Sequence, residues 1–116
     1  MRHKKKKTIL GRETAARKSL LKNLAQDLIL HEKIKTTKAK AKALKPFVEK
    51  LITKSKDSSL ASRRLLIKSL YTENVVRKLI DILGPRYKDR NGGYTRIIDL
   101  DNRKGDGACE SIIEFV

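Results

Sequence analysis

The sequence has a single cysteine, Cys109, no tryptophan and only two prolines. One cysteine excludes an internal disulfide and argues against a cysteine-based metal site. A lone cysteine is also typical of a reducing cytosol, so we expect the protein to stay in the cytoplasm, where it is made. No apolar run approaches the ~20 residues of a membrane-spanning helix. The basic start MRHKKKK is followed by no apolar segment of the kind found in a signal peptide.

Aromatic side chains are also scarce, at 4% of the residues. Aliphatic side chains must therefore supply most of the core of this 116-residue chain, which is about one domain long. A chain this small and this charged is expected to gain part of its order from a partner.

Acidic residues are few: 13 Asp and Glu stand against 29 Lys and Arg, a net charge of +16. Residues 1–50 carry 16 basic and 4 acidic side chains, whereas residues 51–116 carry 13 and 9. A net charge of about 2–8 keeps a small domain soluble, so the larger excess indicates an anionic partner that contacts the N-terminal half. Binding to a membrane surface is disfavoured. A membrane-binding helix inserts exposed Trp or Phe side chains into the lipid, whereas the apolar stripes of this chain are needed for its core. Nucleic acid is the favoured partner.

Catalytic motifs are missing as well. The two histidines, His3 and His31, have no partner at catalytic spacing, and the chain has no Walker A sequence, serine elbow or two-histidine metal motif. GDGACE at 105–110 offers a Gly-x-Gly, but a strand-like run follows it, not the helix that a dinucleotide fingerprint requires. No carboxylate lies in an apolar run that would raise its pKa for acid–base work. We therefore predict a non-enzyme with no catalytic residue, cofactor, metal or small-molecule substrate.

Apolar periodicity predicts an α+β fold: a helix-rich single domain over residues 13–116, preceded by a basic N-terminal arm over residues 1–12. The helices are expected at about 14–30, 38–56, 59–70 and 73–83, with Thr14, Thr37 and Thr72 as N-caps of the first, second and fourth. The last helix is expected to stop at Gly84-Pro85, with Gly84 able to take the left-handed conformation. YTRIIDL (94–100) and ESIIEFV (110–116) are predicted antiparallel strands, and HEKIKTT (31–37) a short strand or extended link, which gives a small sheet of two to three strands.

Lysine outnumbers arginine by 19 to 10, and only three arginines, Arg2, Arg12 and Arg17, fall in the first 50 residues. Lysine is a flexible point charge that suits phosphate neutralisation, whereas arginine offers a rigid fork that reads base edges and stacks on bases. The arm and the second helix are therefore predicted to lie along a phosphate backbone.

The stretch RNGGYTRII, residues 90–98, admits three interpretations: a cofactor loop, a plain turn, or a bend against a bulkier anion. No helix is predicted after it, which excludes the cofactor loop. We expect a turn before a strand, in which Asn91 also tolerates left-handed geometry. Backbone N–H groups of the two glycines are then expected to approach a phosphate that Arg90 and Arg96 flank, while Tyr94 stacks or packs.

The choice between DNA and RNA rests on the third and fourth helices. Joined by YT, they leave open a helix-turn-helix or nucleoid protein that binds DNA, although Glu73 and Asp81 make the fourth a poor recognition helix. A basic arm, lysine-covered helices and an arginine–glycine–tyrosine loop favour a folded RNA with crowded phosphates and unstacked bases.

Several segments are specific to one known family: MRH at the start, LLKNLAQDLILHEKIKTT (20–37), KAKALKPFVEKLIT (40–53), LGPRY (83–87) and RNGGYTRI (90–97). In these segments the chain resembles the bacterial large-subunit ribosomal protein seventeen family, in order and over essentially its whole length. The resemblance implies a non-catalytic structural protein that binds rRNA of the large subunit near the nascent-chain exit tunnel, beside neighbouring large-subunit ribosomal proteins. It also implies the helix-rich fold with a small sheet.

By position, the family's basic start falls on Arg2, His3 and the lysines after them, its Thr-Thr link on Thr36 and Thr37, and its glycine turn on Gly92 and Gly93. Charge pattern, loop and resemblance together predict RNA contacts by the following residues: Arg2, His3, Lys4, Lys5, Lys6, Lys7, Arg12, Arg17, Lys18, Lys22, Lys35, Thr36, Thr37, Lys38, Lys40, Lys42, Arg63, Arg64, Arg86, Arg90, Asn91, Gly92, Gly93, Tyr94 and Arg96.

Overall fold

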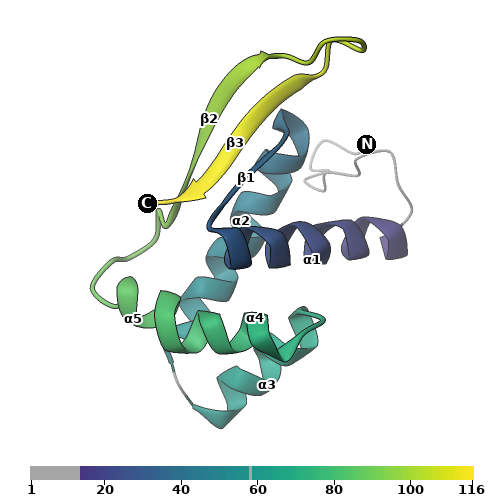
Figure 1. The fold of residues 1–116 in the computed structure, drawn as a ribbon. Coiled ribbons are helices and arrows are strands. Elements are labelled where there is room, and N and C mark those ends of the chain that lie inside the picture. The colour runs from purple at the N-terminus through teal and green to yellow at the C-terminus, as the bar shows by residue number, and fades with distance from the viewer. Residues whose placement is uncertain (1–13, 58) are drawn as a thin grey trace, which may run out of the picture.

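The computed structural model describes residues 14–57 and 59–116, so the predicted basic arm lies outside the described residues. In those residues helices and a small antiparallel sheet form the α+β arrangement that the sequence predicted (Figure 1). The elements in chain order are α1 (Thr14–His31), β1 (Lys33–Thr37), α2 (Lys38–Ser55), α3 (Leu60–Ser69), α4 (Glu73–Lys78), the π-helical turn η1 (Leu79–Leu83), α5 (Gly84–Arg86), β2 (Thr95–Asn102) and β3 (Cys109–Phe115).

The sheet has the order β1-β3-β2, and both pairings are antiparallel. The segment after α1, predicted as a strand or an extended link, is therefore the third strand. Ile113 on the central strand lies opposite Ile34 of β1 and Ile97 of β2. Because side chains alternate across a strand, these three isoleucines share the face that packs on the core. The β2 and β3 strands run beside α2, and only the tip of their hairpin projects beyond the helices (Figure 1).

The long helix α2 is the element that the other parts of the fold pack against. Thr37 is its N-cap, as predicted, and the hydroxyl of Thr37 accepts a hydrogen bond from the Lys40 amide at 3.4 Å. Its buried stripe recurs at helical spacing and consists of Ala41, Leu44, Val48, Leu51, Ile52 and Ser55. This stripe meets α1, α3, η1 and the sheet. The helix continues through Pro46, which lies on its exposed side.

The core is mainly aliphatic, as the composition predicted. Of its 18 buried hydrophobic residues only Tyr87, Tyr94 and Phe115 are aromatic. These three stack in one group, with the rings of Tyr87 and Tyr94 5.3 Å apart and those of Tyr87 and Phe115 6.4 Å apart. They join the segment before β2 to the end of β3.

Two of the predicted N-caps are different in the structure. Thr14, the first described residue, is itself helical and therefore lies within α1. Thr72 precedes α4 as predicted, but its side chain makes no capping hydrogen bond. Its amide and hydroxyl both donate to the side-chain oxygen of Gln26 in α1, at 3.0 and 3.4 Å. The Thr72 hydroxyl therefore donates to a distant side chain and does not serve as the acceptor for the first turn of α4.

The predicted helix stop at Gly84-Pro85 is wrong. Gly84 has φ −55° and ψ −55°, which is right-handed helical, and the helical path runs through η1 into α5. The glycine is needed for space, because a Cβ at this position would lie 2.6 Å from the Ser55 carbonyl oxygen of α2. Gly84 thus marks a close backbone approach between two helices, and the helical path ends at Tyr87.

Replacing Gly84 by alanine is expected to lower the free energy of unfolding by about 1–3 kcal/mol, because the new methyl group overlaps backbone that cannot rotate away. Helix propensity alone predicts the opposite sign, a gain of ~1 kcal/mol for alanine. Urea unfolding of G84A measures the difference. The matched control is Ala39→Gly on the exposed side of α2, which reports propensity without packing. A stabilised G84A would contradict the close approach.

Candidate nucleic-acid interface

The side of α2 opposite its buried stripe carries a row of lysines. Lys42, Lys50 and Lys54 are exposed there, and Lys40 is half-buried at its margin. None of these four pairs with a carboxylate of the described residues. Lys38 at the start of the helix differs, because its ammonium lies 3.4 Å from a carboxylate oxygen of Asp99. The helix thus presents uncompensated positive charge along most of its length.

The loop before β2 is fastened to the C-terminal half of the same helix. Glu49 Oε2 accepts from the Thr95 hydroxyl at 2.8 Å and from the Thr95 amide at 3.3 Å. One turn further on, the hydroxyls of Thr53 and Tyr94 share a hydrogen bond at 3.5 Å. Residues 49 and 53 are four apart and so lie one above the other on one helix face. This face holds the loop against α2.

Lys56 adds a third attachment at the end of α2. Its ammonium donates to the Arg90 carbonyl and lies 4.7 Å from the centre of the Tyr94 ring. The Lys56 ammonium is the main cause that lowers the pKa of the Tyr94 hydroxyl, because a nearby cation favours the ionised phenolate, and the hydrogen bond shared with Thr53 contributes less. The side chain of Lys56 therefore stabilises the loop before β2.

The adjacent glycines form the predicted turn. Gly92 and Gly93 have φ +83° and +63°, a left-handed geometry that other residues adopt at a cost. A Cβ on Gly92 would meet nothing within 4 Å, so its backbone faces open space. The side chain of Arg90 closes the turn by donating from Nε to the Gly93 carbonyl at 3.2 Å.

Tyr94 packs in the core. Its side chain is 2% exposed and contacts Tyr87. Of the two roles predicted for it, stacking on a base or packing, the structure shows packing, and the ring is not free to stack on a base.

Several other predicted RNA-contact residues are engaged with acidic or backbone partners. Arg86 lies 2.5 Å from Glu32, Arg96 lies 3.4 Å from Glu114, and Arg63 lies 3.7 Å from Glu73. Lys22 donates to the Lys68 carbonyl at 3.5 Å and lies 5.1 Å from the centre of the Tyr71 ring. These cations keep exposed surface, but their charge is already partly compensated.

Glu32 is the centre of the strongest of these clusters. It follows α1 with φ +63°, and its amide donates to the Leu28 carbonyl at 2.6 Å. Its carboxylate pairs with Arg86 and with Lys78, the second at 3.2 Å. The hydrogen bond from Arg86 is the main cause that lowers the pKa of the Glu32 carboxyl, with a smaller contribution from Lys78. Arg86 therefore helps to join α5 to the end of α1.

The remaining predicted contact residues lie apart from this loop. Arg17 and Lys18 are on α1, Lys35 and Thr36 are on β1, and Arg64 is on α3. Residues 2–7 and Arg12 lie outside the described residues. The β1–α2 junction thus lies at the N-terminal half of α2 and the glycine turn at its C-terminal half. The other described residues of this set are spread over α1, β1 and α3.

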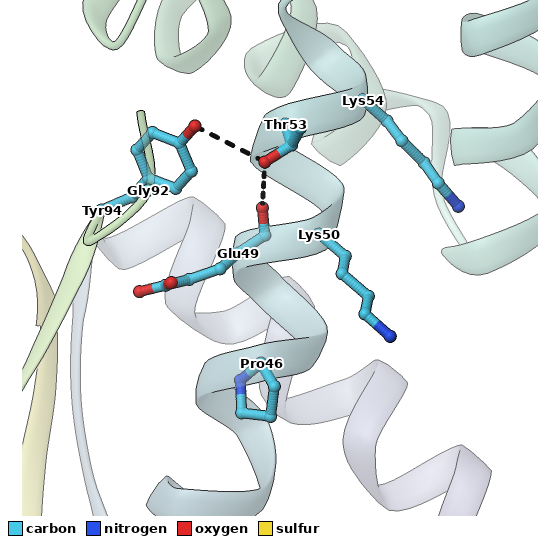
Figure 2. A pocket seen from close by; sticks show the side chains of 7 residues that line it. All are labelled: Pro46, Glu49, Lys50, Thr53, Lys54, Gly92 and Tyr94. Atoms are coloured by element: carbon cyan, nitrogen blue, oxygen red, sulfur yellow. Dashed lines mark hydrogen bonds between the residues drawn. The ribbon is translucent and has the colours of Figure 1, made fainter. Parts of the chain in front are cut away.

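Sequence reasoning missed two lysines that the structure places beside the glycine turn. Lys50 and Lys54 line a pocket of about 420 Å³ together with Pro46, Glu49, Thr53, Gly92 and Tyr94 (Figure 2). The signal was present in the sequence, because the two lysines are four residues apart on the side opposite the apolar stripe. Their proximity to the turn depends on how the loop folds back.

No arrangement for chemistry is found in the described part of the chain. It holds no group of three or more His, Cys, Asp or Glu that could bind a metal ion. His31 is the last residue of α1, and Cys109 is exposed on β3. Among residues 14–57 and 59–116, no helix has both the length and the apolar character to cross a bilayer.

Fold and charge together define a small basic α+β protein with a lysine-rich helix face. A family model described as "Ribosomal protein L17" matches residues 20–116, and the chain belongs to this family. Its proteins are structural and not enzymes.

Individual relatives match over the whole chain. The large ribosomal subunit protein bL17 of Rickettsia bellii is 50% identical over 116 residues, which are 100% of this chain and 82% of that protein. The bL17 proteins of Sphingopyxis alaskensis and of a Hydrogenobaculum species are 52% and 51% identical, and the matches cover 84% and 99% of them. Each match covers 100% of this chain.

Replacing Glu32 by glutamine is expected to lower the free energy of unfolding by about 0.5–1 kcal/mol at neutral pH, the range of partly exposed ion pairs. The folded-state pKa of Glu32 is lowered, so its contribution is present above the unfolded pKa and is lost as pH falls through the folded pKa. The difference between E32Q and the unmodified chain should therefore vanish in acid. Urea unfolding at neutral and acidic pH measures it.

The control for E32Q is Glu110→Gln, because Glu110 forms no ion pair within 4 Å in the described residues. A difference for E32Q that stays constant with pH would show that the lost stability comes from packing or from the left-handed backbone and not from charge.

Proposed function

We propose that this chain is a structural component of the large ribosomal subunit that binds rRNA by neutralising phosphates with lysine and arginine. One observation carries the proposal: the exposed face of α2 holds Lys42, Lys50 and Lys54 without acidic partners. A folded chain with a net charge of +16 repels itself, and a polyanion along this face offsets that repulsion. The relatives are large ribosomal subunit proteins, which supports the same assignment.

The contact surface in this proposal has two parts. The β1–α2 junction, with Lys35, Thr36 and Lys40, lies at one end, and the glycine turn lies near the other end of α2. Lysines in this pattern contact the phosphates of an RNA backbone and so fix its position, but they do not distinguish one base from another. RNA shape and the register of its phosphates then select the binding site.

A DNA-binding role has less support. The helix that would enter the major groove, α4, begins with Glu73 and continues into η1, which carries Asp81. Val75 and Val76 are buried, and η1 packs on α2. The surface that remains is partly acidic, which is poorly suited to a groove lined by phosphates.

The resemblance to the family supports a finer placement. We propose that the chain sits in the cytoplasm on the ribosome, near the nascent-chain exit tunnel, with neighbouring large-subunit proteins as its protein partners. The predicted arm over residues 1–12, with six Lys and Arg, is proposed to add phosphate contacts to those of α2.

Replacing Lys40 and Lys42 by glutamine is expected to weaken binding to bacterial large-subunit rRNA and to flatten its dependence on salt. Each lost phosphate contact should reduce the slope of log K against log salt by about 0.7–0.9, since fewer counterions are released. Fluorescence anisotropy over a range of KCl concentrations measures both quantities. Lys88→Gln with Lys104→Gln is the control of equal charge outside the proposed surface.

An unchanged slope in K40Q/K42Q, or equal losses in the control pair, would contradict specific use of the α2 face. Competition by duplex DNA separates the two nucleic acids: equal competition by DNA and by structured RNA would favour the alternative. Cofractionation of the full chain with large subunits that persists in moderate salt is expected, and a free pool that salt does not change would overturn the ribosomal role.

A further inference from the structure

A shallow, open pocket lies between α2 and the glycine turn. The ring of Pro46 and the side chain of Thr53 lie along its floor on α2, and the loop at Gly92 and Tyr94 forms one wall (Figure 2). Lys50 and Lys54 extend from the opposite flank of α2, with their ammonium groups directed away from the loop (Figure 2). Its volume of about 420 Å³ lies within the ~300–1,000 Å³ range of pockets that hold small ligands.

The walls of this pocket are held in place before any ligand binds. Thr53 donates to the Glu49 carbonyl at 3.0 Å and shares a hydrogen bond with Tyr94, while Glu49 Oε2 accepts both Thr95 donors. The Lys56 ammonium donates a hydrogen bond to the carbonyl of Arg90, which precedes the glycine turn. Binding therefore requires ordering of only the two lysine side chains, which limits its entropic cost.

The polar groups around the pocket differ from one flank to the other. Lys50 and Lys54 provide two ammonium groups that pair with no carboxylate of the described residues. On the loop side, Glu49 uses Oε2 for Thr95, and no donor of the described residues contacts its Oε1. The floor between them is apolar at Pro46. A ligand that fits has an anionic end, a flat apolar body and a hydrogen-bond donor at the far edge.

We propose that this pocket binds one unstacked nucleotide of RNA, with its phosphate on Lys50 and Lys54, its base over Pro46 and the amino edge of the base toward Glu49. The inference rests on the proposed function and names a single-nucleotide site within that surface. Carboxylates accept hydrogen bonds from base amino groups, so adenine, guanine and cytosine fit this site better than uracil, which has no amino group. Base-specific contact here complements phosphate contacts along the rest of α2.

The first experiment titrates the isotope-labelled full chain with each of the four nucleoside monophosphates and follows its amide resonances. The amides of residues 49–54 and 92–94 are expected to shift with AMP, GMP and CMP, and at least several-fold less with UMP. Inorganic phosphate at equal concentration is the matched probe. Equal shifts with phosphate alone would overturn the nucleotide assignment, because only an anion would then be recognised.

The second experiment uses two variants: one fills the pocket with a large side chain, and the other removes its two positive charges. Thr53→Trp occupies its floor without changing charge, and Lys50→Ala with Lys54→Ala removes both cations; each should abolish the nucleotide shifts and weaken binding to large-subunit rRNA at least several-fold. Lys88→Ala with Lys104→Ala is the control for the loss of two charges, and Ala61→Trp is the control for a large side chain on an exposed helix outside the contact surface. Thermal unfolding checks that every variant is folded.

The outcomes separate this site from the wider proposal. If T53W and the unmodified chain bind rRNA equally and the nucleotides shift no pocket amide, the site is overturned while rRNA binding stands. If the unmodified chain fails to bind rRNA at all, the proposed function itself fails. If poly-glutamate displaces rRNA and shifts the pocket amides while the nucleotides do not, the pocket takes an acidic protein segment, which also overturns the assignment.

Discussion

The burial of one stripe of α2 is the interaction on which the rest of the structure depends. Leu44, Val48 and Ile52 are fully buried, and each such side chain contributes about 1.5–3 kcal/mol relative to exposure. The stripe meets the sheet, α1, α3 and η1, so it links elements that otherwise contact one another little. A single helix thus organises a fold whose chain has few aromatic residues.

The same burial sets the direction of the charge. Once the apolar stripe faces inward, the lysines between its members must face outward, and with so few acidic residues nearby they remain unpaired. Lys50 and Lys54 are one helical turn apart, about 6 Å along the axis, so salt screens their repulsion only in part. In the proposed function a polyanion along this face offsets the repulsion, so binding would also stabilise the fold.

Arginine and lysine have separate roles in the chain. Arg63, Arg86 and Arg96 each pair with a carboxylate, and Arg90 closes the glycine turn. The planar guanidinium suits such directed contacts, whereas the flexible ammonium suits a mobile phosphate backbone. The arginines around the glycine turn, which the sequence suggested as RNA contacts, thus also hold the structure that presents the lysines.

The sequence by itself determined the fold class, the helix at 38–55 with its Thr37 cap, the glycine turn and the basic character of one helix face. These depend on local signals: periodicity, capping chemistry, the tolerance of glycine for positive φ, and charge. The family could also be identified from the sequence, because HEKIKTT and GGYTRI are distinctive segments.

Only the tertiary structure decided which interactions replaced the local ones. Gly84 looked like a helix stop, but its role is to let the start of α5 approach the carbonyl of Ser55, which lies 29 positions earlier in the chain. Thr72 looked like a cap, but Gln26 takes its donors. Tyr94 looked able to stack, but it is buried, and Lys50 and Lys54 gained a pocket because the loop folds back onto α2. Each of these depends on which distant segment lies nearby, and local pattern does not contain that information.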